Sequence, residues 1–275
     1  MAYDQKALAE RFQSMHHGTN MFVLPNVWDA GSARIFEKQG FGAVATSSAG
    51  VAYSLGFPDG EDITFDDLLA RVRQIVRRIE IPLSVDFERG YGEDLRRIQD
   101  NARALLRCGA CGFNIEDGKA DGSLDDPGFM LDKITTLKEL KKESGIDFVI
   151  NARTCAYWLS TGNEETMFRT AVERGNAFRK AGADCVFIPG ALDENTVGRL
   201  VRSIDAPLNI ILNPRYHDFA GLEQLGVRRL SVGSGPARSA CNHLIDVAAD
   251  LRRGNVTAML EHPFTYVKAN AYFKD

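Results

Sequence analysis

Eight short apolar runs alternate with longer amphipathic stretches along the chain, and this alternation limits the fold more than any other feature. The apolar runs are residues 21–25, 43–46, 83–86, 112–116, 148–151, 185–188, 208–212 and 229–232. The stretches with helical periodicity are residues 30–39, 65–79, 95–107, 129–143, 165–180, 195–203, a short one near Leu222, and 237–252. Strands that alternate with helices form a parallel sheet, and eight such units in roughly 250 residues are typical of a (β/α)₈ barrel. We therefore predict an α/β protein with a TIM-barrel fold.

A doubly wound open sheet is the alternative architecture. Such a sheet usually carries a Gly-rich phosphate-binding loop after its first strand, whereas the sequence here is Pro25-Asn26-Val27-Trp28-Asp29. The length would also permit two small domains, but no linker interrupts the repeat. We expect one barrel domain over residues 1–275. Within it, residues 254–275 should pack on a neighbouring element or another subunit, because this segment carries Phe264, Tyr266, Tyr272 and Phe273.

Composition excludes several classes of protein. The net charge is −4 and no long Lys or Arg run occurs, which disfavours non-specific binding to nucleic acid or anionic membranes. Residues 1–14 contain no apolar signal-peptide core, and no apolar run approaches the ~18 residues of a membrane span. We therefore expect a cytoplasmic protein. Five cysteines do not suggest a disulfide framework, and the Cys108/Cys111 pair, without a second pair or a nearby His, is expected to be structural.

Acidic residues stand at the ends of two consecutive predicted strands, where TIM barrels build their active sites. Asp86 and Glu88 end the third strand and Glu116 ends the fourth. In extended geometry Asp86 and Glu88 point to the same side. Carboxylates gathered at one barrel mouth repel unless protons or a cation neutralise them, and an all-oxygen set suits a hard ion such as Mg²⁺. The three are therefore candidate metal ligands. The alternative is that each acid caps a helix or is a solvated loop charge.

Further candidates follow other strands. Arg153, at the end of the fifth strand, could bind a substrate carboxylate through two hydrogen bonds or could pair with one of the acids. The small-residue loop with Ser47 and Ser48 could bind a carboxylate or phosphonate through backbone N–H groups. Asn213 could hydrogen-bond a substrate oxygen or begin a turn. Lys119 is a candidate loop residue for closing over the substrate.

Six motifs resemble the isocitrate lyase/phosphoenolpyruvate mutase superfamily, from Pro25 to about Val232. They are residues 25–34 (PNVWDAGSAR), Ser47-Ser48, Leu55-Gly56-x-Pro58-Asp59, Asp86-x-Glu88-x-Gly90-Tyr91-Gly92, Ile115-Glu116-Asp117 and Asn151-Ala152-Arg153-Thr154. Their order and spacing are specific, and the nearest types are 2-methylisocitrate lyases and carboxyphosphonate phosphorylmutases. The resemblance implies a barrel that is often tetrameric, with the last helix exchanged between subunits. It also implies a Mg²⁺ ion, with Mn²⁺ as an alternative, that holds a 2-oxo acid or its enolate.

The resemblance also implies roles for individual residues. Asp86, Glu88 and Glu116 hold the metal, partly through water, and Asp86 thereby also contacts the substrate. Asp59 orders the metal shell. We place Asp59 and Arg153 in the catalytic group and add Lys119 to it as the loop residue that could close over the substrate, which the resemblance itself does not imply. The backbone of Ser47 and Ser48 binds a substrate carboxylate, and Arg153 binds the substrate.

Three departures separate the chain from the family's isocitrate and methylisocitrate lyases. Residues 118–126 contain no Cys, whereas those lyases carry a Lys-Lys-Cys-Gly-His type of motif on this loop, with the Cys as proton donor. Asp86-x-Glu88 stands in place of Asp-x-Asp. Pro189-Gly190 follows the sixth strand, where relatives often place His or Glu. These differences argue against isocitrate or methylisocitrate as the substrate.

Three functions remain open after these observations. The leading prediction is a Mg²⁺-dependent lyase that cleaves a C–C bond of a small 2-oxo or 2-hydroxy carboxylate through a metal-stabilised enolate. The alternative is P–C bond chemistry of the phosphoenolpyruvate mutase, phosphonopyruvate hydrolase or phosphorylmutase type. The third is a barrel that binds metal without turnover. In each case we expect a small carboxylate ligand and a homodimer or homotetramer.

Overall fold

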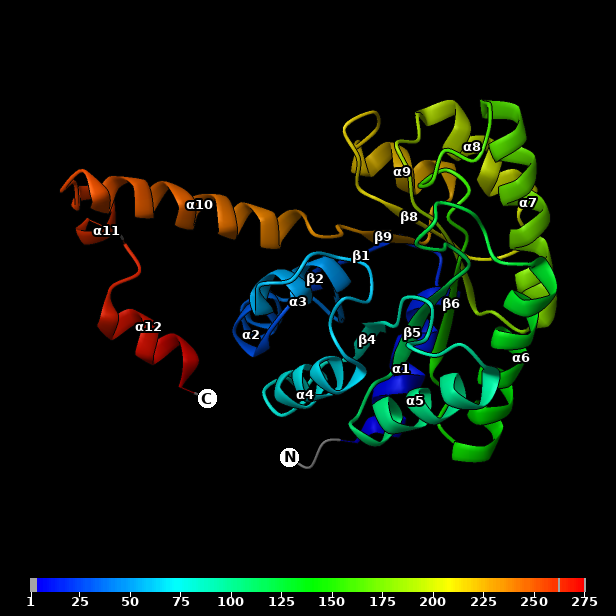
Figure 1. The fold of residues 1–275 in the computed structure, drawn as a ribbon, viewed down its shortest axis with the longest axis horizontal. Helices are drawn as coiled ribbons and strands as arrows, with labels where there is room; N and C mark the ends of the chain where they lie inside the picture. Colours follow the sequence, from blue (N-terminus) through cyan, green and yellow to red (C-terminus); the bar gives the residue numbers. More distant parts are fainter. Residues whose placement is uncertain (1–3, 262, 275) are drawn as a thin grey trace.

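Parallel strands follow one another around a barrel in the computed structural model, which describes residues 4–261 and 263–274 (Figure 1). The strands of this part of the chain are β1 Phe22–Leu24, β2 Asn26–Val27, β3 Val44–Thr46, β4 Leu83–Asp86, β5 Gly112–Glu116, β6 Val149–Arg153, β7 Cys185–Ile188, β8 Leu208–Ile211 and β9 Arg229–Ser231. They pair in the order β1-β9-β8-β7-β6-β5-β4-β3-β2, and every pairing is parallel. The predicted TIM barrel is confirmed.

The first predicted strand is divided at Pro25, which has no backbone N–H to donate. β1 before Pro25 pairs with β9, and β2 after it pairs with β3, so the two halves together close the barrel. Asn26 stabilises this closure of the barrel through three hydrogen bonds. Its Oδ1 accepts from the backbone N–H groups of Val232 (3.0 Å) and Gly233 (2.8 Å), and its Nδ2 donates to Thr46 O (2.9 Å).

The helices predicted from periodicity are present within a few residues of their expected bounds. They are α2 Ala30–Lys38, α4 Phe65–Val76, α5 Leu95–Arg107, α6 Pro127–Ser144, α7 Glu164–Ala181, α8 Glu194–Ser203, α9 Phe219–Leu225 and α10 Gly235–Arg252. A polar side chain immediately before most of them accepts a hydrogen bond from the first turn, which fixes where the helix begins. These N-caps are Asp29, Thr64, Asp94, Asp126, Asn163, Asp193 and Asp218.

Of the described helices that precede the C-terminal segment, two were not predicted. α1 (Gln5–His17) buries Ala9 and Phe12 against a cluster at the amino-terminal end of the barrel that includes Leu24 and Val149. α3 (Ser48–Leu55) replaces the open loop expected after the second strand, because Ser47 caps its first turn by accepting from Gly50 N (3.1 Å). The loop interpretation of this segment was therefore wrong.

Side chains of opposite character alternate along the strands. Residues such as Val85, Ile150 and Leu230 point outward and belong to the apolar core shared with the helices. The alternate positions face the barrel interior, and several of them are polar and buried, namely Ser84, Asn114, Asn151, Asn209 and Arg229. The interior of this barrel therefore contains a polar layer below its mouth.

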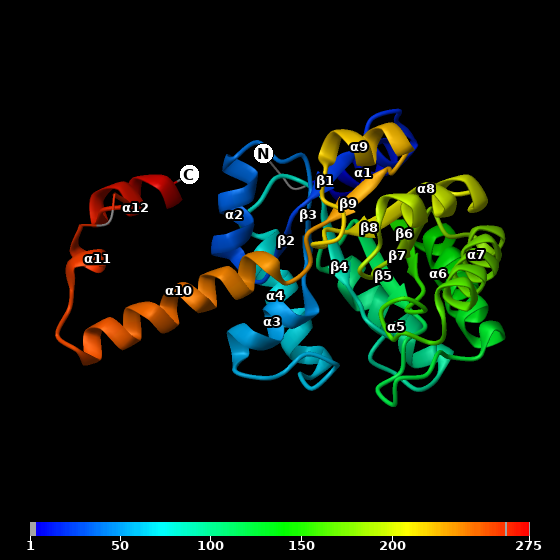
Figure 2. The same ribbon diagram turned by 90° about the horizontal axis from the view of Figure 1, so that it is seen from above.

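The C-terminal segment leaves the barrel. α10 projects away from the other helices, and α11 (Thr257–Leu260) and α12 (Tyr266–Phe273) follow it (Figures 1 and 2). Within α10 the buried residue is Ala237, so the eighth helix does not cover the barrel of its own chain as the other predicted helices do. α12 returns to α2, where Lys38 Nζ donates to Tyr272 O and Gln39 Nε2 donates to Tyr272 Oη (3.4 Å). None of the described helices combines the length and apolar character needed to cross a bilayer.

Candidate active site

Two adjoining cavities open at the carboxyl ends of the strands. The first, here called the loop cavity, has a volume of about 200 Å³ and is lined by Glu88, Glu116, Lys119 and Cys155, among others. The second, the barrel cavity, has a volume of about 360 Å³ and reaches down to Asp86 and Asn114. Both share the lining residues Ser48, Asp59, Arg153 and Trp158. The two cavities therefore form one continuous site.

Asp86 is the last residue of β4 and lies at the bottom of the site, buried. Its backbone N–H donates to Thr46 Oγ1 (2.7 Å), and its Oδ2 accepts from the Ser48 N–H (3.3 Å). The other carboxylate oxygen, Oδ1, is buried and has no hydrogen-bond partner within the described part of the chain. A buried carboxylate oxygen without a donor is costly, so this atom is available for a cation.

Glu88 does not continue the strand. Its backbone adopts a left-handed conformation (φ 50°), so the extended geometry assumed for the Asp86/Glu88 pair ends at Asp86, and that reasoning was wrong. The Glu88 side chain is nevertheless buried in the loop cavity wall. It accepts from Tyr91 Oη (2.6 Å) and from Glu61 N (3.1 Å). Burial, reinforced by the charge of Asp86, raises the pKa of Glu88 to about 9.

Glu116 and Arg153 occupy paired positions on β5 and β6 and form an ion pair of 2.8 Å. The Arg153 guanidinium also lies 5.5 Å from the Trp158 ring centroid and 5.7 Å from that of Phe187. Burial raises the pKa of Glu116 to about 7, against the opposing effect of Arg153. Arg153 therefore forms the ion pair considered for it and also lines both cavities.

Asp59, Ser47 and Ser48 surround the shared entrance. Asp59 lines both cavities, and desolvation raises its pKa while a hydrogen bond with the Ser48 side chain lowers it. The Ser47 N–H donates to Val27 O (2.9 Å) within the sheet. Of the two serine N–H groups, that of Ser48 is the one directed at the acidic centre.

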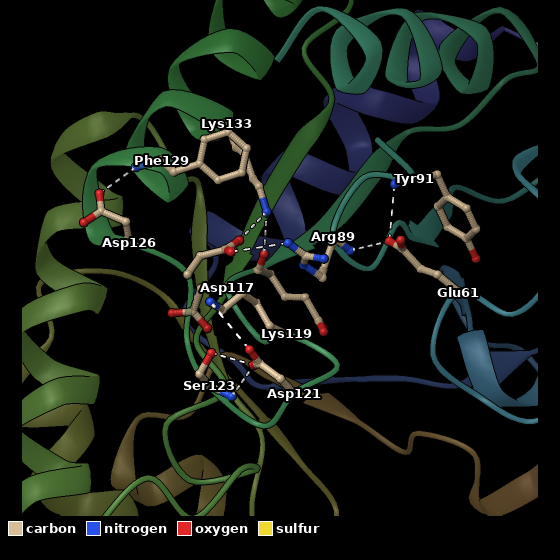
Figure 3. A network of polar contacts seen from close by, with 12 residues as sticks. Glu61, Arg89, Tyr91, Asp117, Lys119, Asp121, Ser123, Asp126, Phe129 and Lys133 are labelled. Carbon is tan, nitrogen blue, oxygen red and sulfur yellow. Dashed lines mark hydrogen bonds and ion pairs between the residues drawn. The ribbon is translucent and has the colours of Figure 1, made fainter. Parts of the chain in front are cut away.

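Lys119 lies in a short hairpin turn beside the loop cavity (Figure 3). Its N–H donates to Ser123 O (2.9 Å), and Asp121 holds the turn by accepting from Ser123 Oγ (2.6 Å). The Lys119 Nζ lies 4.0 Å from Asp121 Oδ2. The structure thus places Lys119 at the cavity wall, where the sequence analysis expected it.

Buried ion pairs anchor both ends of this hairpin. At its start, Asp117 pairs with Arg174 (3.0 Å) and accepts from the Cys155 N–H (2.8 Å). At its end, Asp125 pairs with Lys133 (2.8 Å) and with Arg89 (3.3 Å). The hairpin therefore rises from two fixed points.

Some candidates lie elsewhere. Asn213 does not line either cavity, because its side chain serves its own turn by accepting from Arg215 N (3.0 Å) and donating to Ile211 O (3.3 Å). Cys108 is partly buried, Cys111 is buried, and both are free thiols.

Several lining residues were missed by the sequence analysis. Cys155 directly follows the Arg153-Thr154 strand end and contributes a buried thiol to the loop cavity. Burial raises the pKa of this thiol. Trp158 lies across both cavities. Arg238, at the start of α10, lines the barrel cavity. Position at a strand end could have indicated Cys155. Trp158 comes from a connecting segment and Arg238 from the start of α10, and neither belongs to a motif.

The acidic residues fit a hard cation if only Asp86 contacts the ion directly. Among residues 4–261 and 263–274, no three Asp, Glu, His or Cys side chains are grouped closely enough to surround a metal. Glu116 turns toward Arg153, and Glu88 toward Tyr91. Among the carboxylate oxygens of Asp86, Glu88 and Glu116, Asp86 Oδ1 is the one that is sealed from solvent without a partner in the described chain. The arrangement therefore fits an ion bound directly by Asp86 and reached by the two glutamates through water, a mode that Mg²⁺ favours.

The raised pKa of Glu88 predicts how stability depends on pH. The folded chain holds this proton up to about pH 9, whereas the unfolded chain releases it near 4.5. In EDTA, the stability of the wild type relative to Glu88→Gln should therefore fall as pH rises between these values, by up to about 1.4 kcal/mol per pH unit. Mg²⁺ should stabilise more at pH 9 than at pH 6. Thermal melts of both proteins check this, and a difference between them that stays constant with pH would contradict it.

Comparison with known proteins places the chain among enzymes. The family model described as phosphoenolpyruvate phosphomutase matches residues 12–252. Oxaloacetate decarboxylase 1 of Pseudomonas putida is 30% identical over an alignment of 272 residues that covers 92% of this chain and 90% of that protein.

Solved structures show the same barrel. A protein of Burkholderia cenocepacia J2315, described as a lyase/mutase, matches with a TM-score of 0.91 at 30% identity and covers 98% of both chains. Phosphonopyruvate hydrolase, solved with oxalate and Mg²⁺, matches with a TM-score of 0.85 at 22% identity over 96% of this chain and 94% of that one. At this identity the second likeness concerns the fold alone.

Proposed function

Because this chain belongs to the phosphoenolpyruvate phosphomutase family of lyases and mutases, we propose that it is a Mg²⁺-dependent lyase that cleaves a C–C bond of a small 2-oxo or 2-hydroxy carboxylate. The observation that carries this proposal is the buried, unpartnered Oδ1 of Asp86 beneath a cavity that Arg153 also lines. Asp86 would hold the cation and Arg153 would bind the substrate carboxylate beside it, as a bound 2-oxo acid requires.

Each residue of the site has a part in this reaction. Asp86 would hold the ion directly, and Glu88 and Glu116 through water. When bound, Mg²⁺ supplies a Lewis acid that stabilises negative charge on a neighbouring oxygen. Arg153 and the Ser48 N–H orient the substrate carboxylate. The hairpin that carries Lys119, together with Trp158, restricts the access of water to the loop cavity.

Cleavage of a P–C bond is the second candidate, and Arg238 favours it. This residue lines the barrel cavity and forms no ion pair with the described residues, so it adds positive charge that a phosphonate would use. The decarboxylase, which breaks a C–C bond, is 30% identical to this chain, whereas phosphonopyruvate hydrolase is 22% identical and its likeness is of the fold alone. C–C cleavage is therefore the leading proposal.

The experiment is a substrate panel with Mg²⁺. Oxaloacetate and other 2-oxo and 2-hydroxy acids are assayed for release of pyruvate or glyoxylate, and phosphonopyruvate is assayed for phosphate. Release from the first group alone supports the lyase. Phosphate release would instead establish the P–C enzyme. If no substrate is turned over but Mg²⁺ and oxalate still stabilise the folded protein, the chain is a barrel that binds metal without catalysis. Absence of both turnover and stabilisation would contradict the proposed site.

We also propose that α10 packs on another subunit, giving a homodimer or homotetramer. Leu244 and Ile245 of this helix are 65% and 66% exposed, and Leu260 and Val267 of the following segment are also open. Burial of each such side chain stabilises association by about 1.5–3 kcal/mol. The expected result is an oligomer in light scattering that Leu244→Asp together with Ile245→Asp converts to a smaller species. Ser239→Asp adds charge to the same helix as the control. A wild-type monomer would contradict the proposal.

A further inference from the structure

Arg229 is the largest fully buried side chain that the proposed reaction does not use. It lies on β9 inside the barrel and is 0% exposed. No carboxylate of the described residues forms an ion pair with it, and its Nε and Nη1 find no acceptor among them. Burial lowers its pKa to about 10, so the guanidinium stays charged near neutral pH. The Phe12 ring, whose centroid lies 5.9 Å from the guanidinium carbon, compensates this charge only in part. A buried charge without a carboxylate partner reduces stability, so the presence of Arg229 calls for a function.

The single hydrogen bond of this guanidinium is made to Asn114. Arg229 Nη2 donates to Asn114 Oδ1 (3.2 Å), and Asn151 Nδ2 donates to the same oxygen (2.7 Å). Arginine has no acceptor atom, so only the oxygen of the Asn114 amide can face it. Arg229 therefore fixes the orientation of the Asn114 amide, with Oδ1 toward the guanidinium.

With its oxygen turned to Arg229, the amide presents its Nδ2 on the opposite side. Asn114 is the cross-strand partner of Asp86, and both residues line the barrel cavity. Asn114 Nδ2 forms no hydrogen bond within the described chain, yet it is not among the atoms sealed from solvent. It is thus a free, oriented donor beside the carboxylate proposed to hold the metal.

We propose that Asn114 Nδ2 donates a hydrogen bond to an oxygen of the bound carboxylate substrate, and that Arg229 is the positioning residue that orients this donor. The inference rests on the proposed function, because it takes an anionic carboxylate as the ligand. A donor fixed in advance stabilises a negative oxygen without reorganisation at the moment of binding or reaction. The unpaired charge of Arg229 would thereby contribute to function at the expense of stability.

If Arg229 orients Asn114 at the expense of stability, its loss should weaken oxalate binding without lowering the melting temperature. Arg229→Met removes a buried charge and should leave the melting temperature unchanged or higher, while the freed amide binds oxalate about tenfold more weakly in the presence of Mg²⁺. Asn114→Leu removes the donor and should weaken oxalate binding by about 10- to 100-fold. Arg229→Lys retains a donor and should recover most of the binding.

The decisive experiment is a double-mutant cycle. Calorimetry with oxalate and Mg²⁺ compares the wild type, both single variants and Asn114→Leu/Arg229→Met, with scanning calorimetry for stability. Because Arg229 acts through Asn114, the double variant should bind oxalate as Asn114→Leu does, within about twofold. Asn209→Leu, in the same polar layer but outside the cavity lining, is the matched control and should bind like the wild type.

The outcomes separate this inference from the proposed function. A wild type that does not bind oxalate with Mg²⁺ would overturn both. Normal wild-type binding together with unchanged binding by Asn114→Leu, additive effects, or parallel loss of stability and binding in Arg229→Met would overturn the inference alone. If Asn114→Leu does not fold, Arg229→Met still decides, because its predicted stability differs in sign from that of a residue with a merely structural role.

Discussion

Asp86→Ala is expected to abolish Mg²⁺-dependent activity, with a loss of at least about 10³-fold in kcat/KM. Loss of a Lewis acid removes several kcal/mol of transition-state stabilisation, and each 1.36 kcal/mol corresponds to tenfold in rate. The fold should persist, because the substitution relieves a buried carboxylate oxygen that has no donor. The measurement is turnover of the best substrate of the panel over a range of Mg²⁺ concentrations.

The matched control is Asp94→Ala, which also removes an aspartate near a strand end. Asp94 caps α5 by accepting from Arg97 N (2.8 Å) and does not line the cavities. Its loss should lower stability by about 1 kcal/mol and leave Mg²⁺ dependence unchanged. If Asp86→Ala retained Mg²⁺-dependent stabilisation by oxalate, Asp86 would not be the metal ligand.

Arg153→Ala should weaken the binding of substrate or oxalate by about 10²- to 10³-fold while changing the affinity for Mg²⁺ much less. The large effect is expected because a charged hydrogen-bond donor is lost, and the Glu116 carboxylate that it paired with at 2.8 Å is left buried. The same loss should lower stability by about 1–3 kcal/mol at neutral pH. The cost is moderate because Glu116, whose pKa burial raises to about 7 even beside Arg153, can take up a proton when this partner is lost. Titration calorimetry with each ligand separates the two affinities.

Arg174→Ala provides the comparison for Arg153→Ala. It also breaks an ion pair to a buried acid, Asp117, but it lies outside both cavities. It should reproduce the loss of stability and not the loss of oxalate binding. Equal weakening of metal and substrate by Arg153→Ala would show that its role is structural.

The course of the strands could be predicted because each apolar run is bounded by Gly, Pro or polar residues, and helical stretches separate the runs. Even the break at Pro25 follows from its missing N–H, although the sequence analysis did not use it. α3 was missed because its residues are small and lack a periodic apolar face, and the cap supplied by Ser47 was interpreted as part of a binding loop. The detachment of α10 from the barrel is also not encoded in its periodicity, which resembles that of the packed helices.

Strand ends identified the charged centre of the site, Asp86, Glu88, Glu116 and Arg153, but not the directions of these side chains. The left-handed backbone of Glu88 and the cross-strand pairing of Glu116 with Arg153 depend on tertiary contacts. The polar layer in the barrel interior could also have been predicted from the sequence. Polar residues recur at every second position in Ser84-x-Asp86, Asn114-x-Glu116 and Asn151-x-Arg153, and period two in a barrel strand marks the interior.

The anchored hairpin between Asp117 and Asp125 has a consequence for redesign. Buried ion pairs fix both ends of the hairpin. Residues 119–124 can therefore be replaced by another loop sequence, to change the substrate preference, without disturbing the barrel. Its boundary at Gly118 is strict, since a Cβ there would lie 2.8 Å from the Cys155 Sγ. A graft that brings a larger residue at 118 must therefore be accompanied by a smaller side chain at 155, and the two positions have to be varied together.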